Sequence, residues 1–247
     1  WELTGRLVEK IGEQVRDSTI STFHSFCYSL IQDYVSSENK LQLIEESESI
    51  YLILSNFDSL RPYHSEEFPL NPHKAVGEAI PFINRCRDEM LSPEDLNVNL
   101  IADSLTSSEQ KHQLKDIRNI YEFYQDIKKS QGLVDYGDMI VQAWSLLKND
   151  PSILAQIQKK IKHIIIDEFQ DMNEDFFQVV KSLITHCIGG GMVIGDDDQD
   201  ILTWNRQKWM KKYGKDCPME AIHYFKEFNQ CFDSENYCLR TFSGLVK

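Results

Sequence analysis

Two carboxylic acids follow a short run of isoleucines in the second half of the chain. The run at 161–166 ends in Ile164–Ile166 and leads directly into Asp167 and Glu168. A continuous β-branched run predicts a buried parallel strand with both acids at its carboxyl end. There the first carboxylate can hold Mg²⁺, and the second can orient or deprotonate a water that attacks a phosphoryl group. The alternative is that the acids end a solvent-exposed strand and do no chemistry.

A second acid-tipped strand is predicted further along the chain. Residues Met192–Ile194 lead into Gly195 and Asp196, and a helix is predicted between the two strands at 173–186. Strand, helix and strand then form a βαβ unit with parallel strands. The carboxyl ends of parallel strands lie at one edge of the sheet, where ligands of α/β sheets bind. We therefore expect both acid-tipped ends at the same edge.

The rest of the pattern is mostly helical. The β-branched and aromatic run at 18–23 indicates a short strand between two helices near the N-terminus. Residues 35–130 are predicted to contain helices separated by prolines, and no strand. The other predicted helices cover residues 3–15, 41–57, 75–90, 109–129, 134–147 and 151–162.

Composition limits the classes of protein. The chain has 247 residues, 41% hydrophobic and 26% charged, which is enough for a sizeable core. No apolar run approaches the roughly 20 residues that cross a bilayer, so no membrane association is expected. Scattered cysteines without a C-x-x-C pair favour a reduced, intracellular protein. A net charge of −13 argues against non-specific coating of nucleic acid, so any nucleic-acid site must be local.

Four segments resemble motifs of the UvrD/Rep family of superfamily 1 DNA helicases and occur in the family order. Residues 163–173 contain D-E-F-Q-D, similar to the Walker B segment (motif II), and residues 193–201 contain G-D-D-D-Q-D-I, similar to motif III. Residues 20–27 contain T-F-H-S, and residues 133–140 contain D-Y-G-D-M-I, similar to the family's D-F/Y-x-D-L-I. The joined occurrence of motifs II and III is highly specific.

The resemblance implies a fold and a division of the chain. The fold would be α/β: an incomplete P-loop NTPase (RecA-like) motor domain on a parallel sheet, with an inserted all-helical subdomain. Residues 1–34 would be the first part of the motor domain and 35–130 the inserted subdomain. Residues 131–230 would complete the motor domain, and 231–247 would begin a second one.

The resemblance also implies roles in ATP hydrolysis. Asp167 would bind Mg²⁺, and Glu168 would activate the hydrolytic water. Gln199 would sense the γ-phosphate, and Arg240 would reach it from the second motor domain. The residues implied at the site for ATP and Mg²⁺ are Asp167, Glu168, Gln170, Asp196, Gln199 and Arg240.

A path for single-stranded DNA is implied in the same way. The residues along it would be Thr22, Phe23, His24, Tyr136, Trp204 and Arg206. Residues 204–215 also interleave aromatic and basic side chains, which suits stacking on bases and attraction to phosphates. The alternative for part of this stretch is a solvated helix with Trp209 as a core anchor. His24 and Cys27 lack the partners that a nucleophilic dyad or a metal site would need.

One motif of a complete motor is absent from this sequence. No G-x-x-x-x-G-K-[S/T] loop occurs, so nothing cradles the β- and γ-phosphates. In the family this loop precedes T-F-H-S, and the chain begins with Trp1, so we expect a fragment. Taken alone, the chain is expected to hydrolyse ATP poorly or not at all.

We therefore predict part of an ATP-dependent DNA helicase that translocates on single-stranded DNA, 3′ to 5′, and unwinds duplexes. Expected partners are single-stranded DNA, duplex junctions, and repair or recombination proteins, at a cytoplasmic, nucleoid-associated location. Two alternatives stay open. One is a relative without motor activity that acts as a DNA-binding or scaffolding module, and the other is a nuclease that uses the acidic cluster for two metals.

Overall fold

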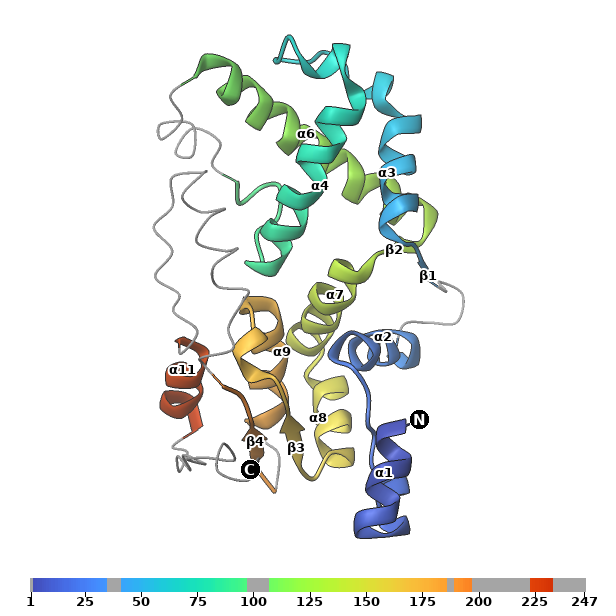
Figure 1. The fold of residues 1–247 in the computed structure, drawn as a ribbon, viewed down its shortest axis with the longest axis vertical. Coiled ribbons are helices and arrows are strands. Elements are labelled where there is room, and N and C mark those ends of the chain that lie inside the picture. Colours follow the sequence, from blue (N-terminus) through green and yellow to red (C-terminus); the bar gives the residue numbers. More distant parts are fainter. Residues whose placement is uncertain (1, 35–40, 97–106, 186–188, 197–222, 233–247) are drawn as a thin grey trace, which may run out of the picture.

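The computed structural model describes residues 2–34, 41–96, 107–185, 189–196 and 223–232. They form two blocks stacked along the long axis of the molecule (Figure 1). The upper block is built from helices, and the lower block combines helices with a small parallel sheet. Within these residues, no helix is both long and apolar enough to cross a lipid bilayer.

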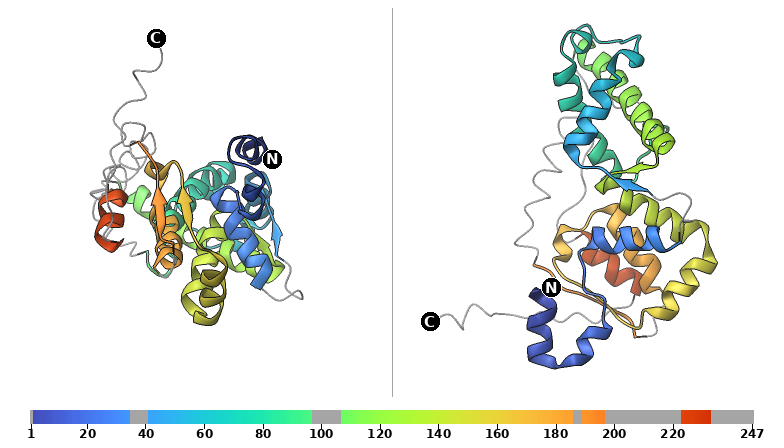
Figure 2. Two further views of the ribbon diagram at one scale, coloured as in Figure 1. Left: turned by 90° about the horizontal axis from the view of Figure 1, so that it is seen from below. Right: turned by 90° about the vertical axis from the view of Figure 1, so that its right-hand side faces the viewer.

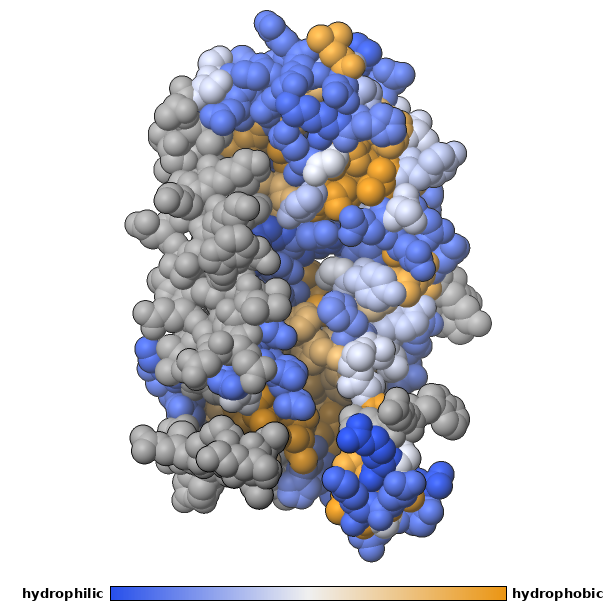
Figure 3. Space-filling view, in the orientation of Figure 1, coloured by the Kyte–Doolittle hydropathy of each residue, from blue (hydrophilic) through white to orange (hydrophobic). Residues whose placement is uncertain are grey.

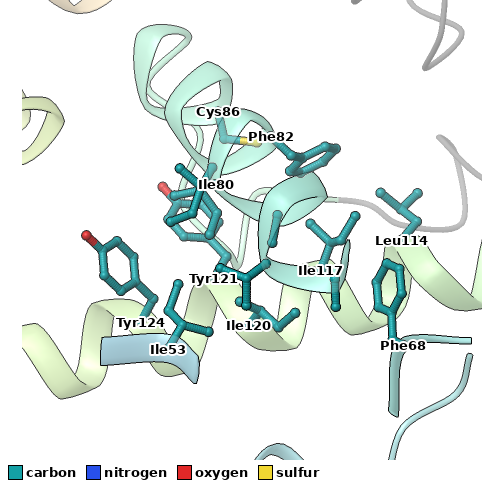
Figure 4. Close-up of a cluster of buried hydrophobic side chains, with 14 of the residues drawn as sticks. Ile53, Phe68, Ile80, Phe82, Cys86, Leu114, Ile117, Ile120, Tyr121 and Tyr124 are labelled. Carbon is teal, nitrogen blue, oxygen red and sulfur yellow. The ribbon is translucent and has the colours of Figure 1, made fainter. Parts of the chain in front are cut away.

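Among the described residues, three helices make the upper block: α3 (Glu46–Ser55), α4 (Pro72–Asp88) and α6 (Ser108–Gln131). The 3-10 helices Phe57–Leu60 and Phe68–Leu70 lie between α3 and α4. Apolar side chains from all of these elements meet in one core (Figure 4). Its fully buried members include Ile53, Phe68, Phe82, Ile120, Tyr121 and Tyr124. The predicted helices of this region are confirmed, with shifted ends.

A short strand is also present here, so the prediction that this block contains no strand is wrong. Strand β1 (Gln42–Leu43) pairs in parallel with β2 (Leu133–Val134). The pair lies at the boundary between the two blocks (Figure 2). Two residues are too few to show the alternation typical of a strand, so the sequence pattern carries no signal for it.

Helices α2, α7, α8 and α9 surround the core of the lower block. Helix α7 packs against both α2 and α9. Buried residues include Cys27 and Ile31 of α2, Ala143 of α7 and Val179 of α9. The bounds are α2 Phe23–Tyr34, α7 Tyr136–Asn149, α8 Pro151–Lys160, α9 Glu174–Ile184 and, near the C-terminus, α11 His223–Phe232.

The predicted parallel strands are confirmed. Strand β3 (Ile164–Ile166) pairs in parallel with β4 (Gly191–Val193), and α9 lies between them in sequence. The prediction that the first strand is buried is wrong, because Ile165 is 69% exposed. Ile164 and Ile166 pack towards a core that includes Phe177 of α9, whereas Ile165 points to the opposite face. Among the described residues, that opposite face has no covering core.

The N-terminal segment differs from the prediction in two respects: the first helix ends at Ile11 rather than at residue 15, and the expected strand is absent. Helix α1 (Glu2–Ile11) is followed by a 3-10 helix (Glu13–Asp17), and residues 18–22 form no strand. Helix α2 begins at Phe23 because Thr22 caps it. The Thr22 hydroxyl accepts the N–H of Ser25 at 3.3 Å, and its carbonyl accepts the N–H of Phe26 at 3.0 Å. A helix start thus replaces the strand that the β-branched run predicted.

Candidate functional site

The two acids after β3 lie at an exposed, sharply turned end of the strand. Asp167 and Glu168 are both exposed. The backbone of Glu168 is left-handed, with φ 54° and ψ 42°, and its N–H donates to Asp167 Oδ1 at 3.0 Å. Such a conformation is uncommon for a residue other than glycine and often occurs at functional sites. The turn directs Phe169 into the core, where it is fully buried, and leaves Glu168 in solvent.

Gln170 connects the ends of the two parallel strands. Its side-chain Nε2 donates to Glu168 Oε2 at 2.5 Å, and its Oε1 accepts the backbone N–H of Asp196 at 3.0 Å. The backbone adds a second link, because Phe169 N–H donates to the carbonyl of Ile194 at 2.9 Å. Gln170 itself is 4% exposed. The expectation that both acid-tipped ends lie at one edge of the sheet is therefore confirmed.

The carboxylates of Asp167 and Glu168 suit Mg²⁺, which needs few protein ligands, better than a metal that is held by protein side chains alone. No group of three or more His, Cys, Asp or Glu side chains that could hold a metal occurs in the described part of the chain. Mg²⁺ usually keeps several waters and takes one or two carboxylates together with substrate phosphates. The exposed carboxylates of Asp167 and Glu168 can supply such ligands.

Four rings from three helices gather near the start of α2. The ring centroid of His24 lies 5.9 Å from that of Tyr136 and 5.3 Å from that of Phe176, both edge to face. The ring of Phe23 also packs against Phe176, with the centroids 4.4 Å apart. Tyr136 is 52% exposed, whereas Phe23 is half-buried within the core. The structure thus brings together three residues assigned to the DNA path.

Burial sets the protonation of the groups around this cluster. It lowers the pKa of His24 below its usual range, so the ring is neutral at pH 7 and offers a stacking surface without charge. Cys27 is fully buried. Burial raises the pKa of its thiol, and the charge of Asp175 raises it further. A protonated, enclosed thiol is a poor nucleophile, which agrees with the sequence-based argument against a dyad with His24.

Asp175 is a buried acid beside the same rings. It is 1% exposed, and its Oδ1 accepts the N–H of Phe176 at 2.7 Å. Burial and the nearby charge of Asp88, with a smaller contribution from Glu89, raise the pKa of Asp175 to about 8. The sequence carries no signal for this environment, because an acid in the first turn of a helix is ordinary.

A cluster of four buried charges lies where the two blocks meet, and the sequence analysis missed it. Arg87 of α4 and Lys128 of α6 each pair with Asp135 and Asp138 at the start of α7. Burial opposes ionisation of Asp135, but the charges of Arg87 and Lys128 prevail and lower its pKa below the usual range. The available signal was D-x-x-D before a helix, which predicts a cap but not its cationic partners.

A cleft opens beside this cluster. It has a volume of about 670 Å³, and its lining includes Arg87, Lys128, Asp138 and Trp144. A hydrophilic band crosses the molecule at the level where the blocks meet, between two more hydrophobic areas (Figure 3). None of the described acids at these strand ends, Asp167, Glu168 and Asp196, lines the cleft. The cleft is therefore a feature of the boundary between the blocks, separate from the acid-tipped strands.

Several residues assigned from the sequence lie outside the described residues. They are Gln199, Trp204, Arg206 and Arg240. The same holds for the acidic run beyond Asp196 and for the segment 204–215. Thr22 is described, and its exposed hydroxyl caps α2 and lies 2.8 Å from the Ser25 hydroxyl.

Comparison with known proteins identifies the relatives of this chain. Residues 1–212 match the family described as UvrD/REP helicase N-terminal domain. The chain is 30% identical over 208 residues to DNA helicase II of Haemophilus influenzae, covering 78% of this chain and 25% of that protein. It is 28% identical over 194 residues to ATP-dependent DNA helicase Rep of Buchnera aphidicola, covering 77% and 27%. It is 25% identical over 206 residues to ATP-dependent DNA helicase PcrA of Staphylococcus epidermidis, covering 82% and 26%.

The acid-tipped parallel strands and these matches relate the chain to proteins named as DNA helicases. It belongs to the UvrD/Rep helicase family, as the four motifs predicted. The chain spans about a quarter of the length of the curated relatives that it matches.

Proposed function

We propose that this chain supplies the hydrolytic carboxylates and part of the single-stranded DNA path of an ATP-dependent DNA helicase. The observation that carries the proposal is the short connection between the two sites. Gln170 holds Glu168 and the backbone of Asp196, and the same segment continues into α9, where Phe176 contacts His24. A change at the acid-tipped edge can therefore reach the ring cluster through a single turn and the first turn of a helix.

The acids would divide the work of ATP hydrolysis. Asp167 would hold Mg²⁺, which when bound neutralises charge on the phosphates. Glu168, exposed and hydrogen-bonded to Gln170, would orient the attacking water and accept its proton. Gln199 and Arg240 would act on the γ-phosphate. Because the sequence lacks a phosphate-binding loop, this chain alone is expected to bind nucleotide weakly.

The rings would contact the DNA. The neutral His24 and the exposed Tyr136 offer surfaces on which bases stack without regard to sequence, as translocation requires. Thr22, Phe23, Trp204 and Arg206 would continue this path. Movement would run 3′ to 5′ towards a duplex junction, and repair or recombination proteins would be the partners.

The proposed organisation follows the two blocks. Residues 1–34 and 131–230 would form the motor domain, and 35–130 a helical subdomain inserted into it. Residues 231–247 would begin a second motor domain. The separate core of the upper block supports this division, because its buried cluster draws on residues 53–124.

The test is binding of a fluorescent single-stranded oligonucleotide, and of a fluorescent ATP analogue with Mg²⁺, to this chain. We expect salt-sensitive oligonucleotide binding and little nucleotide binding. Tyr136→Ala should weaken oligonucleotide binding by about fivefold or more, because one stacked base is lost. Tyr51→Ala is the matched control, since Tyr51 is an exposed tyrosine of α3.

Several outcomes would contradict the proposal or a part of it. Equal oligonucleotide affinity of the Tyr136 and Tyr51 variants would remove the ring cluster from the DNA path. Tight binding of the ATP analogue would mean that another element supplies the phosphate donors. If Glu168→Gln leaves ATP turnover of the full-length helicase intact, Glu168 does not activate the hydrolytic water. If oligonucleotide binds and the unmodified full-length protein hydrolyses no ATP, the module without motor activity becomes the better description.

A further inference from the structure

The first turn of α7 presents alternating environments over four residues. Asp135 and Asp138 are buried, each 6% exposed, and Tyr136 between them is 52% exposed. The acids form a capping box: Asp135 Oδ1 accepts the N–H of Asp138 at 3.0 Å, and Asp138 Oδ2 accepts the N–H of Asp135 at 3.2 Å. The turn that carries Tyr136 is thus fixed by its own carboxylates.

The same carboxylates are held from the upper block. Lys128 Nζ lies 2.9 Å from Asp135 Oδ2 and 2.5 Å from Asp138 Oδ2. Arg87 Nη1 lies 3.2 Å from Asp138 Oδ1 and also pairs with Asp135 Oδ1. The hydroxyl of Tyr124 adds a bond to Asp135 Oδ2 at 2.6 Å. Each acid therefore meets both cations, and α4 and α6 together define where α7 begins.

Gly137 makes the close approach of Arg87 possible. A Cβ atom at Gly137 would lie 2.8 Å from Arg87 Cζ and 2.9 Å from its Nε. Both distances are shorter than real Cβ contacts, so any side chain here must displace the guanidinium. The guanidinium is also confined, because the Arg87 side chain is 5% exposed. Glycine at this position thus serves the packing of Arg87 on the turn.

We propose that Arg87 and Lys128 are positioning residues for DNA binding: by fixing Asp135 and Asp138 they hold the exposed ring of Tyr136 against His24. The inference rests on the proposed function, because it assumes that Tyr136 contacts the DNA. Buried ion pairs often add little net stability compared with apolar residues of the same volume, but they can enforce one arrangement. In this arrangement, α4 and α6 of the upper block fix the position of the Tyr136 ring in the lower block.

The test displaces Arg87 without removing any charge. Gly137→Ala adds one methyl group against the guanidinium, whereas Gly77→Ala, in α4, adds the same group where nothing lies within 4 Å. Both glycines are helical, so alanine suits the backbone in both cases. We expect Gly137→Ala to weaken binding of a fluorescent single-stranded oligonucleotide by about fivefold or more, and Gly77→Ala to leave it unchanged.

A double-mutant cycle separates positioning from general damage. If Gly137 acts through Tyr136, the double variant Gly137→Ala/Tyr136→Ala should bind no more than about twofold more weakly than either single variant. Binding is measured below the melting temperature of each variant. Losses that multiply in the double variant would overturn the inference, because Arg87 would then act elsewhere.

The remaining outcomes distinguish this inference from the proposed function. Full binding by Gly137→Ala together with weak binding by Tyr136→Ala would overturn the positioning role and keep the DNA contact. Full binding by Tyr136→Ala would overturn both. If Gly137→Ala does not fold, Tyr124→Phe removes the hydroxyl that donates to Asp135 and should weaken binding in the same direction by a smaller factor.

Discussion

Two pairs of acids in this chain end up in opposite surroundings. Asp167 and Glu168, after β3, are exposed and contact a backbone N–H and the amide of Gln170. Asp135 and Asp138, at the start of α7, are buried against two cations and cap their own helix. The first pair keeps lone pairs that water, a metal or a phosphate-bound cation can use, and the second pair is satisfied by the protein.

The difference separates a site that can do chemistry from a structural one. We call the structural one the joint; it consists of Arg87, Lys128, Asp135 and Asp138. A carboxylate can bind a ligand only if removing its present partners costs little, which holds for an exposed pair and not for a buried, doubly paired one. Both pairs lie in family motifs, so motif membership alone does not distinguish them. Burial and partners do: the pair after β3 is accessible to a ligand, and the pair at α7 joins the two blocks.

Removing one cation from the joint tests most directly whether its charges hold the two blocks together. Lys128→Met leaves two buried carboxylates facing Arg87 alone and is expected to destabilise the fold by about 3–5 kcal/mol. Lys129→Met is the matched control, because Lys129 is the exposed neighbour on the same helix, and it should change stability by less than about 0.5 kcal/mol. Urea unfolding measures both. Equal stabilities of the two variants would show that the joint is not held by its charges.

Asp175 represents a third kind of acid, which is buried and, among the described residues, forms no ion pair of the kind seen in the joint. The pKa of Asp175 is raised to about 8 by burial and by Asp88, while in the unfolded chain an aspartate titrates near 3.9. The folded state therefore keeps a proton that the unfolded state releases, so this contribution is complete below about pH 4 and is lost as pH rises to 8. The groups that face it are Cys27 of α2, Arg87 and Asp88 of α4, and Glu89 directly after α4.

Asp175→Asn should remove this dependence. Between pH 6 and pH 8 the unmodified chain is expected to lose about 2 kcal/mol of stability relative to the variant, because each pH unit costs about 1.4 kcal/mol. Asp126→Asn, at an exposed position of α6, should leave the difference near zero. Urea unfolding at several pH values gives the comparison. Parallel curves for all three proteins would mean that Asp175 is ionised in the folded state.

Features that depend on local sequence could be predicted, and features that depend on distant neighbours could not. The strand Ile164–Ile166, its parallel partner and the placement of both acid-tipped ends at one edge of the sheet were predictable, because continuous β-branched runs and βαβ handedness are local rules. The exposure of Ile165 was not, since it depends on what covers the far face of the sheet. Periodicity describes a segment and says nothing of its neighbours.

The side-chain partners in the joint could not be predicted from the sequence. Asp135 and Asp138 were readable as a helix cap, but Arg87 lies in another helix of the upper block, and no spacing rule links it to α7. The run at 18–22 shows a competition between local rules: strand propensity favoured one outcome, and the capping hydroxyl of Thr22 favoured the other. The cap prevailed, because no described strand pairs with that run.

The smallest effect is expected at the hydrogen bonds that join the exposed acids. Gln170→Leu removes the donor to Glu168 and the acceptor for the N–H of Asp196. Glu168 is exposed, so water can replace the lost partner, and stability should fall by only about 1 kcal/mol. The sharper readout is amide hydrogen exchange, which should rise at Asp196 and not in the upper block. Gln131→Leu, at an exposed position of α6, is the control. Unchanged exchange at Asp196 would mean that the backbone hydrogen bonds of Ile194 with Phe169 and Ile166 are sufficient to hold the two strand ends together.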